Sequence, residues 1–168
     1  MPPTAAAPSS AALAYHRGVT GTPTAEAGTF IAIPEDIRAF IDDTRFATIG
    51  TIDPDGAPRQ AVVWYTVESD EVVLNSAVGR RWPSNLVRDP RVAFSVIDDD
   101  DGYRWIGLTG IVTVVEDQAT AQADIAGMAR RYHADDPDKA ERLIRRQFER
   151  QARISFRVRV VAATRHFD

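Results

Sequence analysis

The chain has 168 residues, of which 44% are hydrophobic and 26% are charged, and its formal net charge is -4. This length fits one domain with a single core, and the composition is ordinary for a soluble globular protein. No apolar run approaches the roughly 20 residues that span a bilayer, and the net negative charge argues against broad nucleic-acid binding. Because the chain has no cysteine, disulfides, thiolate metal sites and a cysteine nucleophile are excluded.

Residues 1–30 predict a flexible tail ahead of a folded domain over residues 31–168. Ala, Pro, Thr, Ser and Gly dominate this segment, so it cannot bury enough apolar surface to offset the entropy of ordering. It could instead order across a partner subunit. No basic start precedes a continuous apolar segment, so we expect a cytoplasmic protein without a secretory signal.

The first predicted elements are a helix and a β-hairpin. Apolar residues at helical spacing predict a short helix over residues 34–43. Residues 45–53 and 58–67 then alternate apolar with polar or small residues and are rich in β-branched and aromatic types. The intervening Asp53–Gly56 turn sequence joins them as a hairpin.

The middle of the chain predicts further strands around one short helix. Strands are expected over residues 71–77, 91–98 and 103–116, with a helix at 83–88. The acidic run Asp98–Asp101 is interpreted as a solvated loop, since it lacks the alternating spacing of calcium ligands.

The last part of the chain predicts two helices and a closing strand. The period changes to helical over residues 117–133 and again over 138–149, and residues 153–167 alternate as a strand. In the preceding long strand, Gly107 and Gly110 predict a bulge, a bend or a close backbone approach. The fold class is therefore mainly β with flanking helices, with six strands in a closed or nearly closed antiparallel barrel.

The sequence excludes several common catalytic arrangements. His16, His133 and His166 are not accompanied by a serine motif such as G-x-S-x-G, and no H-x-x-x-H pair indicates a metal centre. The dinucleotide fingerprint and the Walker phosphate loop are also absent. We predict no metal site.

The segment LNSAVGRRWPSNLVRDPRVAF has the features of an anion-binding loop. A strand ends at Ser76, a glycine follows, and Arg80 and Arg81 precede a helix start, where forked guanidinium donors and free amides suit a phosphate. An equally good interpretation is a solvated basic turn, with Trp82 packed on the barrel.

This segment, together with RFATIGTIDPDGAPRQAVVWYTV and YRWIGLTGIVTVVED, resembles the pyridoxamine 5'-phosphate oxidase-like split β-barrel family. More narrowly, the chain is similar to the flavin/deazaflavin oxidoreductases of the B group. The similarity runs from about residue 44 to residue 168. The most specific motif is the NL-x-R-DPR-V run that begins at Asn85.

The resemblance implies a six-stranded split barrel that binds two cofactors at the interface of a homodimer. It places the cofactor ring against residues 61–65 and the phosphate near residues 76–85. Many members carry a Lys where this chain has Trp82, so Arg80 or Arg81 must replace that contact. The implied cofactor-binding residues are Ala61, Val62, Val63, Trp64, Ser76, Arg80, Arg81, Trp82 and Asn85.

The family uses FMN in some members and the deazaflavin F420 in others. The arginine-rich loop favours F420, whose phosphate and oligoglutamate tail are anionic, with FMN as the alternative. The expected function is therefore hydride transfer between this cofactor and a small organic substrate such as an enone, quinone or tetrapyrrole. We expect the protein to bind neither nucleic acid nor a membrane.

Two features are left open. No catalytic residue is assigned, since the cofactor supplies the hydride chemistry, and Tyr65, Tyr103 and Arg104 are only weak proton-donor candidates. A non-catalytic flavin or haem carrier is the alternative function, for which His133 or His166 would supply the axial ligand.

Overall fold

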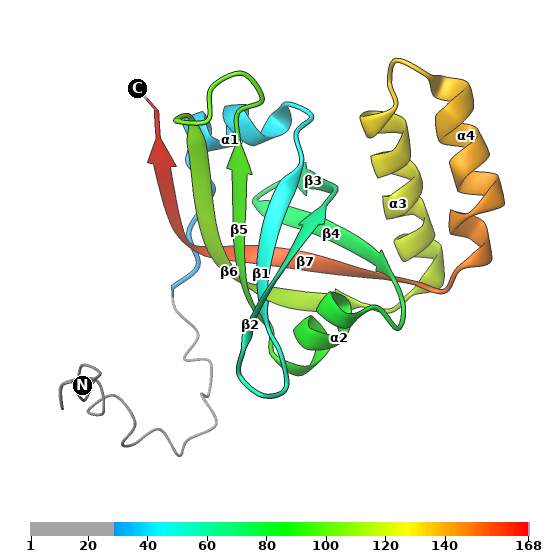
Figure 1. The fold of residues 1–168 in the computed structure, drawn as a ribbon, viewed down its shortest axis with the longest axis horizontal. Helices are drawn as coiled ribbons and strands as arrows, with labels where there is room; N and C mark the ends of the chain where they lie inside the picture. Colours follow the sequence, from blue (N-terminus) through cyan, green and yellow to red (C-terminus); the bar gives the residue numbers. More distant parts are fainter. Residues whose placement is uncertain (1–28, 168) are drawn as a thin grey trace, which may run out of the picture.

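A computed structural model describes residues 29–167 of the chain. Seven antiparallel strands form one curled sheet in the order β2-β1-β5-β6-β7-β4-β3, with helices around it (Figure 1). The predicted class, mainly β with flanking helices, is confirmed. Residues 1–28 of the predicted tail lie outside the described residues.

The elements follow the predicted order closely. The strands are β1 (Ala47–Ile52), β2 (Pro58–Val63), β3 (Tyr65–Glu68), β4 (Glu71–Ala77), β5 (Arg91–Ile97), β6 (Trp105–Val115) and β7 (Arg153–His166). The helices are α1 (Glu35–Asp42), α2 (Arg81–Arg88), α3 (Gln118–Tyr132) and α4 (Pro137–Arg146). A separate 3-10 turn follows over Phe148–Arg150, where the predicted last helix was expected to continue to residue 149.

The prediction of six strands is wrong by one, because the expected strand over residues 58–67 breaks at Trp64. The Trp64 ring leaves the sheet and stacks on Tyr132 of α3, with centroids 4.9 Å apart. The next amide, Tyr65 N, donates to the Tyr132 hydroxyl at 3.2 Å. The chain therefore leaves β1, the partner of β2, and pairs as β3 with β4 at the opposite edge of the sheet. The two edge strands of the sheet, β2 and β3, are therefore consecutive in the chain, and the corner between them curls the sheet.

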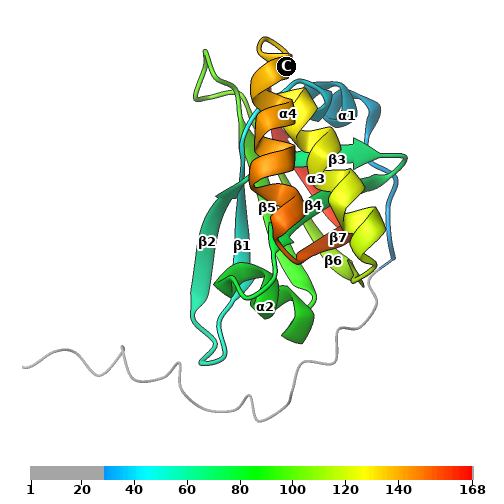
Figure 2. The same cartoon turned by 90° about the vertical axis from the view of Figure 1, so that its right-hand side faces the viewer.

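Two apolar cores hold the structure together. The larger one fills the inside of the curled sheet and contains fully buried side chains such as Tyr65, Leu74 and Phe156. The smaller one joins the outer side of β4 to α3 and α4, around Val73 and Met128. Figure 2 shows these two helices side by side as a layer against the barrel. The helix pair thus forms an interface with the outer face of the sheet, and a pocket can form at this interface.

The two glycines of β6 behave differently. The register of β6 and β7 shifts between Thr109 and Gly110, because Val161 is an extra residue on β7. A Cβ atom on Gly110 would lie 2.6 Å from the Arg159 carbonyl oxygen, whereas one on Gly107 would meet only the Trp105 ring at 3.6 Å. The predicted bulge and close approach are confirmed at Gly110.

Within residues 29–167, no helix has the length and apolar character required to cross a membrane.

Candidate functional site

A pocket of about 240 Å³ opens where the barrel meets the helix layer. The corner between β2 and β3, strand β4, the start of α2, helix α3, the turn after α4 and the start of β7 all contribute to it. Its lining is Phe46, Val62, Val63, Trp64, Asn75, Arg80, Trp82, Ile125, Gln147, Phe148 and Arg153. Aromatic rings and two guanidinium groups in one cavity suit a planar ligand that carries an anionic group.

The structure brings five of the nine predicted cofactor-binding residues to this pocket. Val62, Val63 and Trp64 come from the corner, and Arg80 and Trp82 come from the start of α2. Trp82 is only 9% exposed and its ring lies 5.7 Å from that of Phe156. It therefore packs in the barrel core and also lines the cavity, and its role in cofactor binding stays a prediction. The remaining four residues do not line the cavity.

Arg81 and Asn85 bind Asp53, which is 4% exposed at the hairpin turn. Arg81 donates from Nε and Nη2 to the two carboxylate oxygens at 3.0 and 2.9 Å. Asn85 Nδ2 donates to Oδ1 at 2.8 Å, and Arg59 forms a further ion pair. The hydrogen bond from Arg81, followed by that from Asn85, holds the pKa of Asp53 well below its usual range. This cluster attaches α2 to the hairpin and gives Arg81 a carboxylate partner outside the pocket.

Ala61 and Ser76 face away from the pocket. Ala61 is partly buried and packs against the barrel core. Ser76 is 1% exposed, and its hydroxyl has no hydrogen-bond partner among the described residues. Because successive side chains of a strand point to opposite faces, Ser76 and its neighbour Asn75 lie on opposite sides of β4. Asn75, and not Ser76, reaches the cavity from this strand.

Arg153 and Phe148 are pocket residues to which the sequence analysis assigned no role in binding. Arg153 is 3% exposed at the start of β7, and its guanidinium lies 5.2 Å from the Phe148 ring centre. Strand β7 also contains Arg157 and Arg159. The sequence pattern therefore does not indicate which of these arginines is buried at a cavity. Phe148 falls within the predicted last helix over residues 138–149, for which no binding role is predicted.

The proton-donor candidates lie away from the pocket. Tyr65 is fully buried and donates its hydroxyl to the Ile41 carbonyl at 3.0 Å, and burial raises its pKa above the ordinary value. Tyr103 and Arg104 line a separate hollow near the chain end. None of these three side chains lines the pocket, although Tyr65 belongs to the predicted ring-binding range 61–65.

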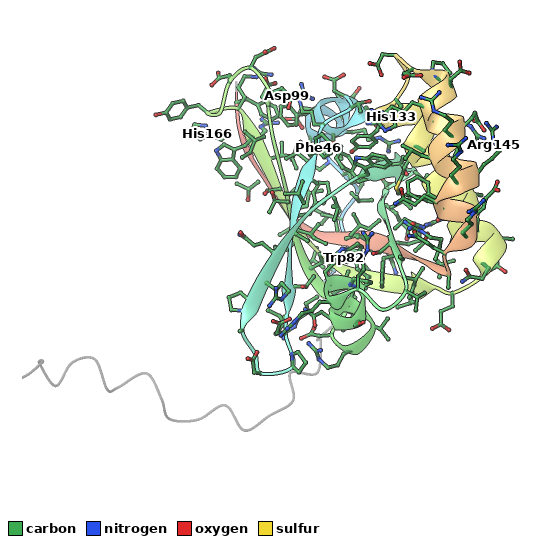
Figure 3. The ribbon with its side chains drawn as sticks, turned by 45° about the vertical axis from the view of Figure 1, so that its right-hand side comes forward. Phe46, Trp82, Asp99, His133, Arg145 and His166 are labelled. Carbon is green, nitrogen blue, oxygen red and sulfur yellow. The ribbon has the colours of Figure 1, made fainter. Side chains whose placement is uncertain are left out.

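The two histidines of the described residues differ in position. The His133 ring lies edge-on to Trp64 with centroids 5.5 Å apart, next to the pocket wall. The His166 ring stacks on Trp105, and Figure 3 places it on the other side of the barrel from His133. No cluster of His, Asp and Glu in residues 29–167 could hold a metal ion.

The comparisons with known proteins agree with the fold. The family model for pyridoxamine 5'-phosphate oxidase matches residues 33–164. The chain therefore belongs to the pyridoxamine 5'-phosphate oxidase family, and the resemblance inferred from the sequence is confirmed. A comparison with curated proteins gives no match.

Several solved structures share the fold. One described as an F420 reductase is 26% identical, with a TM-score of 0.63 over 79% of this chain and 98% of that chain. The conserved protein Rv2991 from Mycobacterium tuberculosis is 24% identical, with a TM-score of 0.66 over 82% and 86%. The haem storage protein HutZ from Vibrio cholerae is 17% identical, with a TM-score of 0.61 over 80% and 95%. The last two show the fold alone.

Proposed function

We propose that this protein is an F420-dependent oxidoreductase that transfers a hydride between the deazaflavin ring and a small organic substrate. The observation that carries the proposal is the pocket at the β2–β3 corner, which combines aromatic walls with two guanidinium groups. The similarity to the F420 reductase, which covers almost all of that chain, supports F420 over FMN as the cofactor. FMN is the alternative cofactor. An enone, quinone or tetrapyrrole is the proposed substrate class, which rests on the family, and we also propose a cytoplasmic location.

The residues present fit such a cofactor. Val62, Trp64 and Phe46 offer apolar and aromatic surface for a planar ring, and Arg80 offers a cation for its anionic part. When bound, the deazaflavin supplies the hydride chemistry, and the protein contributes binding, orientation and exclusion of water. The exposed fractions of 59% for Phe46 and 69% for Val62 leave an apolar rim at which a small substrate can reach the ring.

The alternative is a non-catalytic carrier of flavin or haem. His133 beside Trp64 is the observation that favours haem, because an axial histidine must lie near the pocket. Identification of the ligand released from the purified protein distinguishes the oxidoreductase from the carrier. We expect a deazaflavin by mass and absorbance, and no Soret band. A haem spectrum that is lost in His133→Ala would contradict the proposed oxidoreductase.

We also propose that the protein is a homodimer through the outer face of β1, β5 and β6. Two adjoining hollows on this face share Gly50, Ala93 and Thr109, whose small side chains permit close approach of a second sheet. Gln60 lines one of these hollows and Val62 lines the cofactor pocket. Since these two residues lie on the same face of β2, a second copy on the outer face would reach the mouth of the pocket.

Light scattering at micromolar concentration tests the assembly. We expect a dimer that buries well over the ~1,000 Å² typical of biological contacts. Ala93→Arg should give a monomer with weakened cofactor binding, because a charged side chain would be buried between the copies. A wild-type monomer that binds its cofactor fully would contradict the dimer and the shared site.

A further inference from the structure

Arg153 is a buried cation with no carboxylate partner among residues 29–167. Its Nε and Nη2 donate to Asn75 Oδ1 at 3.0 and 2.6 Å, and its Nη1 donates to Gln151 Oε1 at 2.8 Å. A guanidinium has five N–H groups, so these bonds leave two without an acceptor among the described residues. Asn75 is itself fixed, because its Nδ2 donates to Ala121 O and Ser155 Oγ, both at 2.8 Å.

Two other partly buried arginines, Arg157 and Arg45, have the carboxylate partner that Arg153 lacks within the described part of the chain. The side chain of Arg157 is 17% exposed and pairs with Asp124 at 2.8 Å. That of Arg45 is 14% exposed and pairs with Asp98 at 3.1 Å. Buried charges in proteins are normally paired, since an unpaired ion loses its hydration without compensation. Arg153 is more buried than both, and the neutral amides of Asn75 and Gln151 do not neutralise it.

A second guanidinium lies at the same cavity. Arg80, the residue before α2, is exposed and lines the pocket together with Arg153. Burial, and then the charge of Arg80, lower the pKa of Arg153 to about 10, so that it still carries its charge at neutral pH. An anion between the two groups would satisfy the free N–H donors and remove the repulsion.

We propose that Arg153 and Arg80 together form the receptor for a phosphate group of the ligand, and that Arg81 takes no part in it. The inference rests on the proposed function for the identity of the ligand, but the anion site itself depends only on the two arginines and the cavity. Arg81 is excluded because its charge is paired with the Asp53 carboxylate and its side chain does not line the cavity. Arg153 positions the anion from the floor of the pocket, and Arg80 covers it from the solvent side.

FMN and riboflavin differ only in the phosphate and therefore probe this site directly. The ratio of their affinities is measured by fluorescence quenching for the wild type, Arg153→Gln and Arg80→Gln, with Arg145→Gln as the control. Arg145 is exposed on the outer side of α4 (Figure 3) and its loss changes the net charge equally. We expect the wild type to favour FMN by tenfold or more, as charge-assisted bonds imply. This preference should fall to about one in both pocket variants and persist in Arg145→Gln.

The outcomes separate this inference from the proposed function. A folded Arg153→Gln that keeps the full preference for FMN would overturn the role of Arg153 and leave the flavin site standing. If Arg153→Gln does not fold, Arg153→Lys and Arg80→Gln replace it in the test. A reduced preference for FMN in Arg153→Lys and no preference in Arg80→Gln would support the receptor. A full preference for FMN in Arg80→Gln would overturn it.

A second probe works without any flavin. Inorganic phosphate, compared with chloride at equal ionic strength, should raise the unfolding temperature of the wild type and of Arg145→Gln, but not of Arg80→Gln. If neither FMN, riboflavin nor F420 binds and this protection is found, the proposed function fails and the anion receptor stands. No protection and no preference for FMN would overturn the receptor.

Discussion

Replacing Gly110 by Ala should lower the free energy of unfolding by about 2 kcal/mol, the central cost of overpacking a dense interior. The new Cβ atom would lie 2.6 Å from both the Arg159 carbonyl oxygen and Val158 Cγ1. The carbonyl belongs to the backbone of β7, so relief requires that β6 and β7 separate at the bulge. The measurement is urea unfolding followed by circular dichroism, with the slope m unchanged.

Gly107→Ala is the matched control on the same strand. Its Cβ atom would meet only the edge of Trp105, at the ordinary contact distance of 3.6 Å. Since glycine in a strand loses more backbone entropy on folding than alanine, this variant should gain about 0.5–1 kcal/mol. Equal stability of Gly110→Ala and the wild type would show that the strands do not approach closely at this bulge.

The order of elements could be predicted from the sequence because local patterns determine it. The hairpin at Asp53–Gly56, the alternating strands and the helical period after residue 117 all follow from neighbouring residues. The break at Trp64 could not be predicted, since its cause is a distant side chain, Tyr132, which stacks on the ring and binds the next amide. An uninterrupted run of β-formers carries no mark of such a contact.

The candidate site was predictable where the resemblance supplied it and less so elsewhere. Val62, Trp64 and Arg80, which the resemblance implies as cofactor-binding residues, line the pocket, and their binding role stays a prediction. The sequence could not distinguish Arg80 from its neighbour Arg81, because that difference depends on Asp53, which lies 28 residues away from Arg81 along the chain. Arg153 was missed because its burial arises from the helix layer that packs over β7.

Replacing Arg80 and Arg81 together by Ala should weaken F420 binding at least tenfold while the fold remains. A charge-assisted hydrogen bond contributes about 1.5–3 kcal/mol, and about 1.4 kcal/mol corresponds to a factor of ten. Most of the loss should come from Arg80, which lines the pocket. Arg81→Ala alone should affect stability more than binding, because it removes two hydrogen bonds to Asp53.

Fluorescence titration of the wild type and this double variant with F420 and with FMN tests both the proposed cofactor and the proposed site. We expect the wild type to bind F420 more tightly than FMN at moderate salt. The double variant should lose at least tenfold in F420 affinity, and Arg145→Ala, outside the pocket, should not. Micromolar binding of FMN by the wild type with none of F420 would contradict the proposed cofactor, and unchanged F420 binding by the double variant would contradict the proposed site.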